Sequence, residues 1–289
     1  MSLNITNAYR FQASWNDNKY KAFFKTKTKM ISIICIFFYF FLGIAFGSFA
    51  NVVIMRLHSG EKGILKGRSH CAKCNHSLSV WDLIPLFSWL FLKGKCRYCH
   101  KPISFQYPLV EFVMGAMFVA AYIASVFVAN QSPFYEIWLL AIFFPFTILF
   151  IYDLLYMQLP DEVSLPAIVV LFGFTFLDFT PTWQDALIGA AIPLGFFGAQ
   201  YLISKGKWIG EGDFRLGILM GFILGWKLTI VALFLSYILG SIVGVYVLAS
   251  KSKKMSSQLP FGPFLILGTI ITLFAGNEIL DWYLGFLGF

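Results

Sequence analysis

Long apolar runs are the feature that most constrains how this chain can fold. Several of them reach the roughly 20 residues that an α-helix needs to cross a bilayer core of about 30 Å. Of the 289 residues, 58% are hydrophobic and only 12% are charged, whereas a soluble domain carries roughly a quarter charged residues. The sequence therefore predicts an all-α polytopic membrane protein and excludes a single core folded in water.

Hydropathy predicts about eight transmembrane helices. We expect them near residues 31–55, 108–129, 134–152, 163–179, 184–204, 214–225, 227–250 and 259–280. The sixth covers only 12 residues, and its boundary with the seventh can be drawn differently. We divide the chain into an N-terminal extension (1–30), a first transmembrane helix (31–55), a cytoplasmic domain (56–107) and a membrane core (108–289).

The distribution of Lys and Arg predicts which loops face the cytoplasm, because cytoplasmic loops collect basic residues. Nine basic residues lie between the first two expected helices, and three more follow the seventh. The connections after the second and fourth helices carry none. We therefore place four loops inside, those at 56–107, Asp153, Gly210 and Lys251. This rule also explains the net charge of +8, so we expect no nucleic-acid partner.

Residues 1–29 do not fit this alternation, because they carry six basic residues on the side expected to be outside. Either the later loops override this segment, or translation begins at Met30 and the preceding residues are an upstream extension, which we favour. No small-residue cleavage site follows the first apolar run. We therefore expect no cleavable signal peptide.

Four of the five cysteines form two C-x2-C pairs with 21 residues between them, Cys71 and Cys74 followed by Cys96 and Cys99. Each pair can aim two thiolates at one ion, and four thiolates complete the tetrahedral shell of zinc with no position left for water. The spacing therefore predicts a structural zinc site. Two alternatives are a pair of disulfides, which a reducing cytoplasm disfavours, and replacement of one thiolate by His70, His76 or His100.

The segment between the two cysteine pairs is rich in aromatic residues, but Asp82 and Pro85 interrupt it. It is therefore not expected to cross the membrane. We expect it to lie at the membrane surface or to pack within the zinc domain.

Ionisable side chains at the edge of a transmembrane helix are costly, and each is a candidate functional residue. Asp153 ends the third expected helix, and Asp213 ends the Gly-Glu-Gly-Asp stretch before the sixth, 60 positions later. Two carboxylates brought together can share one proton, so that the ionised acid activates water and the protonated acid polarises a peptide carbonyl. Gly210 and Gly212 can adopt positive φ and let another backbone approach closely.

A simpler interpretation is that these acids cap helices or pair with Arg215 and Lys207. The glycines that follow, at 217, 221 and 225, share one helix face. Such a face predicts close packing with a neighbouring helix. That packing could bring Asp213 towards the helix that ends at Asp153.

Five stretches together resemble the type IV prepilin peptidases, over roughly residues 43–270. They are GSFANVVIMRL (47–57), the two cysteine pairs enclosing WDLIPLFSWLFLKGK, ISFQYPLVE (103–111), YDLLYMQLPDEVSLP (152–166) and GEGDFRLG (210–217). The resemblance implies an aspartic endopeptidase of the bacterial inner membrane that removes the short basic leader of prepilins or pseudopilins on the cytoplasmic side. It also implies that Asp153 and Asp213 are catalytic, that Asp161, Gly210 and Gly212 support them, and that the four cysteines bind zinc.

The resemblance further implies N-methylation of the new N-terminal residue with S-adenosylmethionine as methyl donor. The family's methylation is associated with the large cytoplasmic loop, where Gly94 of LKGKC is the first residue to test. Nothing in the spacing of residues reveals a methyl-donor site. Zinc is not expected to be catalytic, because some relatives lack the cysteines.

Two other functions are consistent with parts of the sequence. A polytopic transporter or channel could use the membrane-edge carboxylates and carry the zinc loop as a structural cap. A membrane-tethered nucleic-acid binder could use the basic loop. The chain shows no clear internal repeat, and its key acids lie at one membrane edge, so the sequence favours the peptidase.

Overall fold

The computed structural model describes residues 33–60, 67–127, 134–249 and 259–287. Within these ranges the chain forms helices, two isolated β-bridges and no strand. Six helices are long and apolar enough to cross a membrane: Ile33–Ser59, α3 (Gln106–Phe127), α4 (Phe134–Tyr156), α6 (Trp183–Ser204), α7 (Glu211–Ala249) and α8 (Gly262–Leu287). The predicted all-α membrane fold is confirmed. Residues 1–30 lie outside the described residues.

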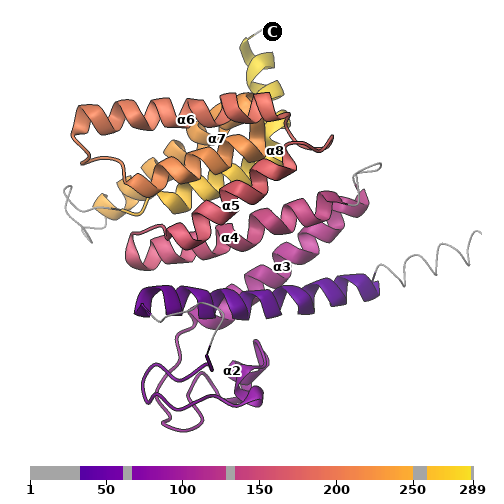
Figure 1. The fold of residues 1–289 in the computed structure, drawn as a ribbon, viewed down its shortest axis with the longest axis vertical. Helices are drawn as coiled ribbons and strands as arrows, with labels where there is room; N and C mark the ends of the chain where they lie inside the picture. The colour runs from indigo at the N-terminus through magenta and orange to yellow at the C-terminus, as the bar shows by residue number, and fades with distance from the viewer. Residues whose placement is uncertain (1–32, 61–66, 128–133, 250–258, 288–289) are drawn as a thin grey trace, which may run out of the picture.

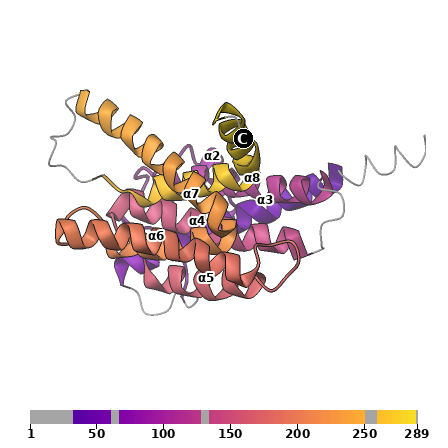
Figure 2. The ribbon, with the colours of Figure 1, turned by 90° about the horizontal axis from the view of Figure 1, so that it is seen from above.

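The helices lie side by side in a layered bundle. Figure 1 shows the first helix next to α3 and α4, followed by α5 (Asp161–Phe174) and then by α6, α7 and α8. Contacts between α3 and α4, α4 and α5, α5 and α7, and α6 and α7 follow the same order. Seen from above, α5 and α6 lie along one side of the bundle and α7 and α8 along the other (Figure 2).

The sixth and seventh expected helices are joined as α7, which is broken at Gly225. The φ and ψ angles of Gly225 are 67° and 178°, a backbone region open essentially to glycine alone. Neighbouring residues of α6 contact both arms, since Phe197 packs on Phe214 and Phe196 packs on Tyr237. Positions 214 and 237 would lie about 35 Å apart on a straight helix, so the chain reverses direction at Gly225.

The structure has six helices of membrane-spanning length among the described residues, whereas about eight were expected. Two physical causes explain the difference. The first is the fusion across Gly225. The second is α5, which has 14 residues and ends at Phe174 instead of near 179. A helix of this length spans about 21 Å, less than the thickness of a bilayer core.

Three helices extend beyond their expected ends. The first helix continues to Ser59, α4 to Tyr156 and α8 to Leu287. Asp153 therefore lies in the last turn of α4. Stacking of His58 on Tyr156, with ring centroids 3.8 Å apart, connects the ends of the first helix and α4.

The glycine face of α7 packs as expected, although the neighbour is α6 rather than the helix that ends at Asp153. A Cβ atom on Gly221 would lie 2.1 Å from the backbone nitrogen of Ala190, and one on Gly217 would lie 2.8 Å from Pro193. Glycine is therefore required at both positions. This packing fixes the start of α7 relative to α6.

Residues 67–105 form a small domain at the side of the first helix, drawn below it in Figure 1. It contains two short helices, η1 (Val80–Leu83) and α2 (Phe87–Phe91). The aromatic segment between the cysteine pairs therefore belongs to this domain and does not form a long helix. This matches the expectation that it packs within the zinc domain.

Candidate functional site

A cavity of about 1150 Å³ lies where the first helix, the α4–α5 connection, the α6–α7 connection and the start of α8 meet. The expected catalytic and supporting residues all line it: Asp153, Asp161, Gly210, Gly212 and Asp213. The fold thus brings together two segments that are 60 positions apart in sequence.

Asp153 enters this cavity from the last turn of α4. It is 6% exposed, and its carboxylate accepts a hydrogen bond from the backbone N–H of Gly262, the first residue of α8. Its charge also interacts with that of Asp213. The two carboxylates are therefore neighbours across the cavity.

Asp213 lies in the first turn of α7 and is 8% exposed. Its Oδ2 accepts a hydrogen bond of 3.1 Å from the backbone N–H of Gly210, as an acidic residue does when it caps a helix. The capping interpretation and the functional one are thus compatible, since one oxygen can cap α7 while the carboxylate lines the cavity. Within the described residues, neither Asp153 nor Asp213 forms an ion pair.

Asp161 links the start of α5 to the start of α7 through an ion pair. It begins α5 and forms an ion pair with Arg215 of α7. Arg215 also donates a hydrogen bond of 3.0 Å to the carbonyl oxygen of Leu159. Arg215 therefore pairs with Asp161 and not, as the simpler interpretation held, with Asp213.

The two glycines of the Gly-Glu-Gly-Asp stretch differ from each other in their surroundings. Neither Gly210 nor Gly212 has positive φ, so the structure does not use the conformational freedom that glycine permits there. A Cβ atom on Gly212 would lie 2.7 Å from the side chain of Leu159, whereas one on Gly210 would meet only Asp213 Oδ2 at 3.6 Å. Gly212 is thus required for contact with the protein's own α4–α5 segment.

Residues 259–262 contribute to the site although they were not among the predicted site residues. Leu259, Pro260 and Phe261 line the cavity. A Cβ atom on Gly262 would lie 2.6 Å from Asp153 Oδ2, so only glycine fits there without moving the carboxylate. The Phe-Gly-Pro sequence at the start of the last apolar run was a usable signal, because such a glycine often marks a close approach.

The four cysteines of the loop domain form one cluster. Their sulfur atoms all lie within 4.8 Å of one another, and no histidine or acidic side chain belongs to the group. Cys71 Sγ and Cys99 Sγ are 3.9 Å apart, close to the roughly 3.8 Å separation of two thiolates on a tetrahedral zinc ion. The cluster can hold a zinc ion, as the spacing predicted.

Both C-x2-C turns have the same backbone hydrogen bonds. In the first, Cys71 donates to the carbonyl of His76 and accepts from Asn75; in the second, Cys96 donates to Lys101 and accepts from His100. All four cysteines are free thiols, so the disulfide alternative is not observed. Burial raises the pKa of the Cys71 thiol, but hydrogen bonds from the backbone N–H groups of Lys73 and Cys74 outweigh it and lower the pKa to about 7. The pKa of the neighbouring Cys74 thiol is instead raised to about 11, because a lowering hydrogen bond from the backbone N–H of His76 is outweighed by desolvation and by hydrogen bonds with Cys99 and Cys71.

Asp82 anchors the segment between the two turns. Its carboxylate accepts hydrogen bonds from the Ser79 hydroxyl at 2.8 Å and from Arg97 Nε at 2.6 Å. Burial raises the pKa of Asp82, but the hydrogen bonds from Ser79 and Arg97 outweigh it and hold the pKa below its usual value of 3.8. The acid that interrupts the apolar segment therefore ties it to the second cysteine turn.

Gly94 lies in the loop domain and does not line the large cavity. Its φ is +69°, and a Cβ atom there would lie 2.9 Å from the indole of Trp89. Gly94 therefore determines the position of the Trp89 ring.

Comparison with known proteins gives an independent result. The family model described as the bacterial peptidase A24 N-terminal domain matches residues 41–125, and the model described as the type IV leader peptidase family matches residues 138–245. Together these matches include the cysteine cluster and both cavity acids. No solved structure matches the chain.

Several curated relatives carry the name prepilin leader peptidase/N-methyltransferase. The relative from Aeromonas hydrophila is 31% identical over 85% of this chain and 92% of its own length. The relative from Bacillus subtilis is 30% identical over 88% of this chain and 98% of its own length, and the one from Xanthomonas campestris is 32% identical over 86% and 93%. Similarity of this extent shows that the chain belongs to the type IV leader peptidase family.

Proposed function

We propose that this protein is an aspartic endopeptidase of the bacterial inner membrane. It removes the leader of type IV prepilins or pseudopilins, with its active site facing the cytoplasm. One observation carries the proposal: Asp153 and Asp213 line the same cavity, are both buried, and interact with each other without a basic partner among the described residues.

This arrangement suits hydrolysis without a metal ion. With one proton shared between two carboxylates, the ionised acid takes a proton from water, whose oxygen forms a bond to the peptide carbonyl carbon, while the protonated acid donates to the carbonyl oxygen. The C–N bond then breaks and the leaving nitrogen takes up a proton. The products are the leader with a new carboxylate and the mature chain with a free amine.

The charge around the cavity matches a basic leader. Besides the proposed catalytic pair, three acids line it, Asp161, Glu162 and Glu211, against the two basic residues Lys207 and Arg215. Complementary charge steers association and orients a bound partner. The positively charged leader would therefore lie towards these acids.

We further propose that zinc has a structural role and that the protein also N-methylates the new N-terminus. Four thiolates leave no open position on zinc for substrate. The methylation proposal rests on the name of the relatives. No feature of the described residues favours the alternative of a transporter or channel.

The test uses purified enzyme and a prepilin that carries its leader, with the product analysed by mass spectrometry. Asp153→Asn and Asp213→Asn keep side-chain shape but remove the acid. Each should reduce leader removal by about a hundredfold to ten-thousandfold, the usual contribution of a general acid or base. Asp178→Asn is the matched control, because Asp178 is exposed and does not line the cavity. Normal cleavage by either cavity variant would overturn the proposal.

A further inference from the structure

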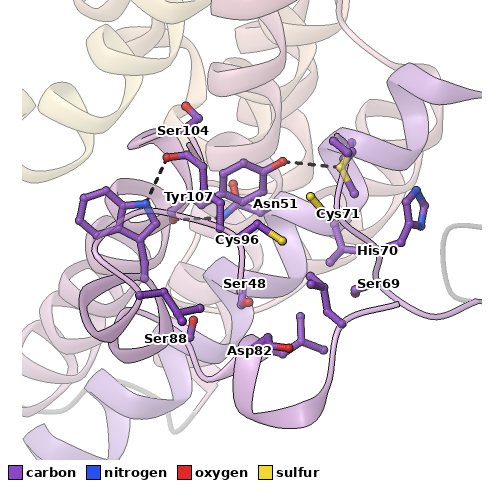
Figure 3. A pocket seen from close by; sticks show the side chains of 18 of the residues that line it. Ser48, Asn51, Ser69, His70, Cys71, Asp82, Ser88, Cys96, Ser104 and Tyr107 are labelled. Carbon is purple, nitrogen blue, oxygen red and sulfur yellow. Dashed lines mark hydrogen bonds between the residues drawn. The ribbon is translucent and has the colours of Figure 1, made fainter. Parts of the chain in front are cut away.

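A second cavity, of about 290 Å³, lies between the loop domain and the membrane helices. Figure 3 shows around it Ser48 and Asn51 of the first helix, Tyr107 of α3, and Cys71, Asp82 and Cys96 of the loop domain. It is separate from the cavity that holds Asp153 and Asp213. The leader peptidase proposal makes no use of it.

Asn51 has an unsatisfied acceptor at this cavity. The side chain is 4% exposed, and its Nδ2 donates a hydrogen bond of 3.1 Å to the carbonyl oxygen of Tyr107. This bond fixes the orientation of the amide, and Oδ1 is left buried without a partner. Since buried polar atoms are nearly always hydrogen-bonded, Oδ1 points to a ligand that brings an N–H or O–H donor.

Glu111 adds a negative charge to the same cavity. It is 7% exposed and lines the cavity from α3. Its Oε2 accepts a hydrogen bond of 2.7 Å from the backbone N–H of Leu86, and the side chain of Ser48 donates to the same carboxyl group. No basic side chain among the described residues forms an ion pair with it. A buried carboxylate without a basic partner favours a ligand that carries positive charge.

Two aromatic rings, Trp89 and Tyr107, also line the cavity. Aromatic faces attract organic cations and stack on planar rings. The lining therefore combines an orphan acceptor, the Glu111 carboxylate and aromatic surface with the Asp82–Arg97 ion pair and Lys73. Its volume is near the lower end of the range for small-molecule sites.

We infer that this cavity binds S-adenosylmethionine, a sulfonium cation with an adenine ring, ribose hydroxyls and an ammonium group. Asn51 Oδ1 accepts a hydrogen bond from the ligand, and the Glu111 carboxylate balances its positive charge. This inference rests on the N-methyltransferase part of the proposed function. It identifies the donor site, which the sequence did not reveal.

The position of the cavity suits methylation of a freshly cleaved chain. Met55 of the first helix lines this cavity and Leu57 lines the one with Asp153, so the two cavities lie on either side of one helix end. When bound, the donor would supply a methyl group to the new amine: the C–N bond would form as the C–S bond breaks, with the electron pair left on sulfur and one amine proton released to water.

Gly94 acts on this cavity through Trp89. A methyl group at Gly94 would push on the indole, which donates a hydrogen bond of 3.3 Å to the carbonyl of Ile103, another lining residue. Gly94 is therefore a positioning residue for the donor site. Gly94→Ala should therefore weaken binding of the methyl donor, although residue 94 does not line the cavity.

The test measures binding of radiolabelled S-adenosylmethionine to the purified full-length protein in lipid nanodiscs. Asn51→Leu removes the orphan acceptor and Glu111→Gln removes the charge, and each should weaken binding by about tenfold or more, the effect of losing a hydrogen bond to a charged ligand. Thr272→Val is the matched control, because Thr272 Oγ1 is also buried without a partner but belongs to α8, away from this cavity. It should bind the donor as the unchanged protein does.

Leader removal and methyl addition are measured as separate mass changes on the same samples, so the two proposals can fail independently. Wild-type affinity in both Asn51→Leu and Glu111→Gln would overturn the inference, as would a protein that cleaves prepilin but binds no S-adenosylmethionine. A protein that binds the donor at this cavity but leaves the leader in place would support the inference and overturn the peptidase proposal.

Discussion

Gly262 donates its backbone N–H to the carboxylate of Asp153, and a Cβ atom at Gly262 would lie 2.6 Å from Asp153 Oδ2. The start of α8 therefore holds a residue at the end of α4, although the two are more than 100 positions apart in sequence.

This relationship predicts that Gly262→Ala impairs leader removal. The added methyl group would displace the Asp153 carboxylate and separate it from Asp213, so we expect the rate of cleavage to fall by about a hundredfold, the size of effect that misplacement by about 1 Å can cause. Gly240→Ala is the control, because a Cβ atom there would meet ring carbons no closer than 3.5 Å. Cleavage assays on both variants, at equal amounts of membrane-inserted protein, check this. Equal rates would show that Asp153 tolerates the displacement.

The ion pair between Asp161 and Arg215 predicts a smaller effect. Asp161→Asn removes the charge that holds Arg215, but the hydrogen bond from Arg215 to the Leu159 carbonyl remains. Because the pair is partly exposed, the interaction energy between its two charges is small. Its loss should therefore disturb the site only slightly, and we expect the rate of cleavage to fall by roughly tenfold at most. Arg215→Gln should resemble it, and the double variant should be no worse than the more impaired single one. Additive losses would indicate that the two residues act separately.

Zinc removal should loosen the loop domain. Cys71→Ser replaces one of four clustered thiols, and a three-thiolate site binds zinc more weakly. We expect less than one zinc ion per protein by elemental analysis and faster proteolysis at the lysines of the loop. Cys35→Ser is the control, because Cys35 lies outside the cluster. Unchanged zinc content in Cys71→Ser would contradict the tetrad.

The lowered pKa of Asp82 predicts how the loop domain responds to acid. Its folded pKa lies below the usual 3.8, so its hydrogen bonds stabilise the loop above that value, and this contribution is lost as the pH falls through the folded pKa. Asp82→Asn should therefore destabilise the loop at pH 7, and the difference from wild type should shrink below about pH 4. Hydrogen exchange over residues 79–98 measures it at each pH. A difference that persists unchanged into acid would contradict the role of the Asp82 charge.

The sequence predicted the residues of the candidate site better than their surroundings. Asp153 and Asp213 stand out because a charge at a membrane edge is costly, and the cysteine pairs stand out because their spacing matches one ion. The partner of Asp153 could not be predicted in this way. Gly262 contributes a backbone N–H and an absent side chain, and the Phe-Gly-Pro stretch around it signals a close approach without showing which residue approaches.

The structural roles of Gly225 and of the glycine face of α7 could likewise be predicted only in part. Hydropathy located the division near 225 but could not show a reversal within one residue, because that depends on a backbone angle. Glycine spacing in α7 predicted a close neighbour, but not that the neighbour is α6, since such a face fits any helix with small residues in register.

The reversal at Gly225 has a consequence for the proposed catalytic acid at the far end of the same arm. An arm from Glu211 to Leu224 is too short to fix its own depth in a bilayer by hydropathy. Its depth instead depends on the number of residues between Asp213 and the turn. Insertion or deletion of a single residue in that interval would move Asp213 by about 1.5 Å along the helix and about 100° around it. Its carboxylate would then turn away from Asp153, although no residue of the site had been replaced.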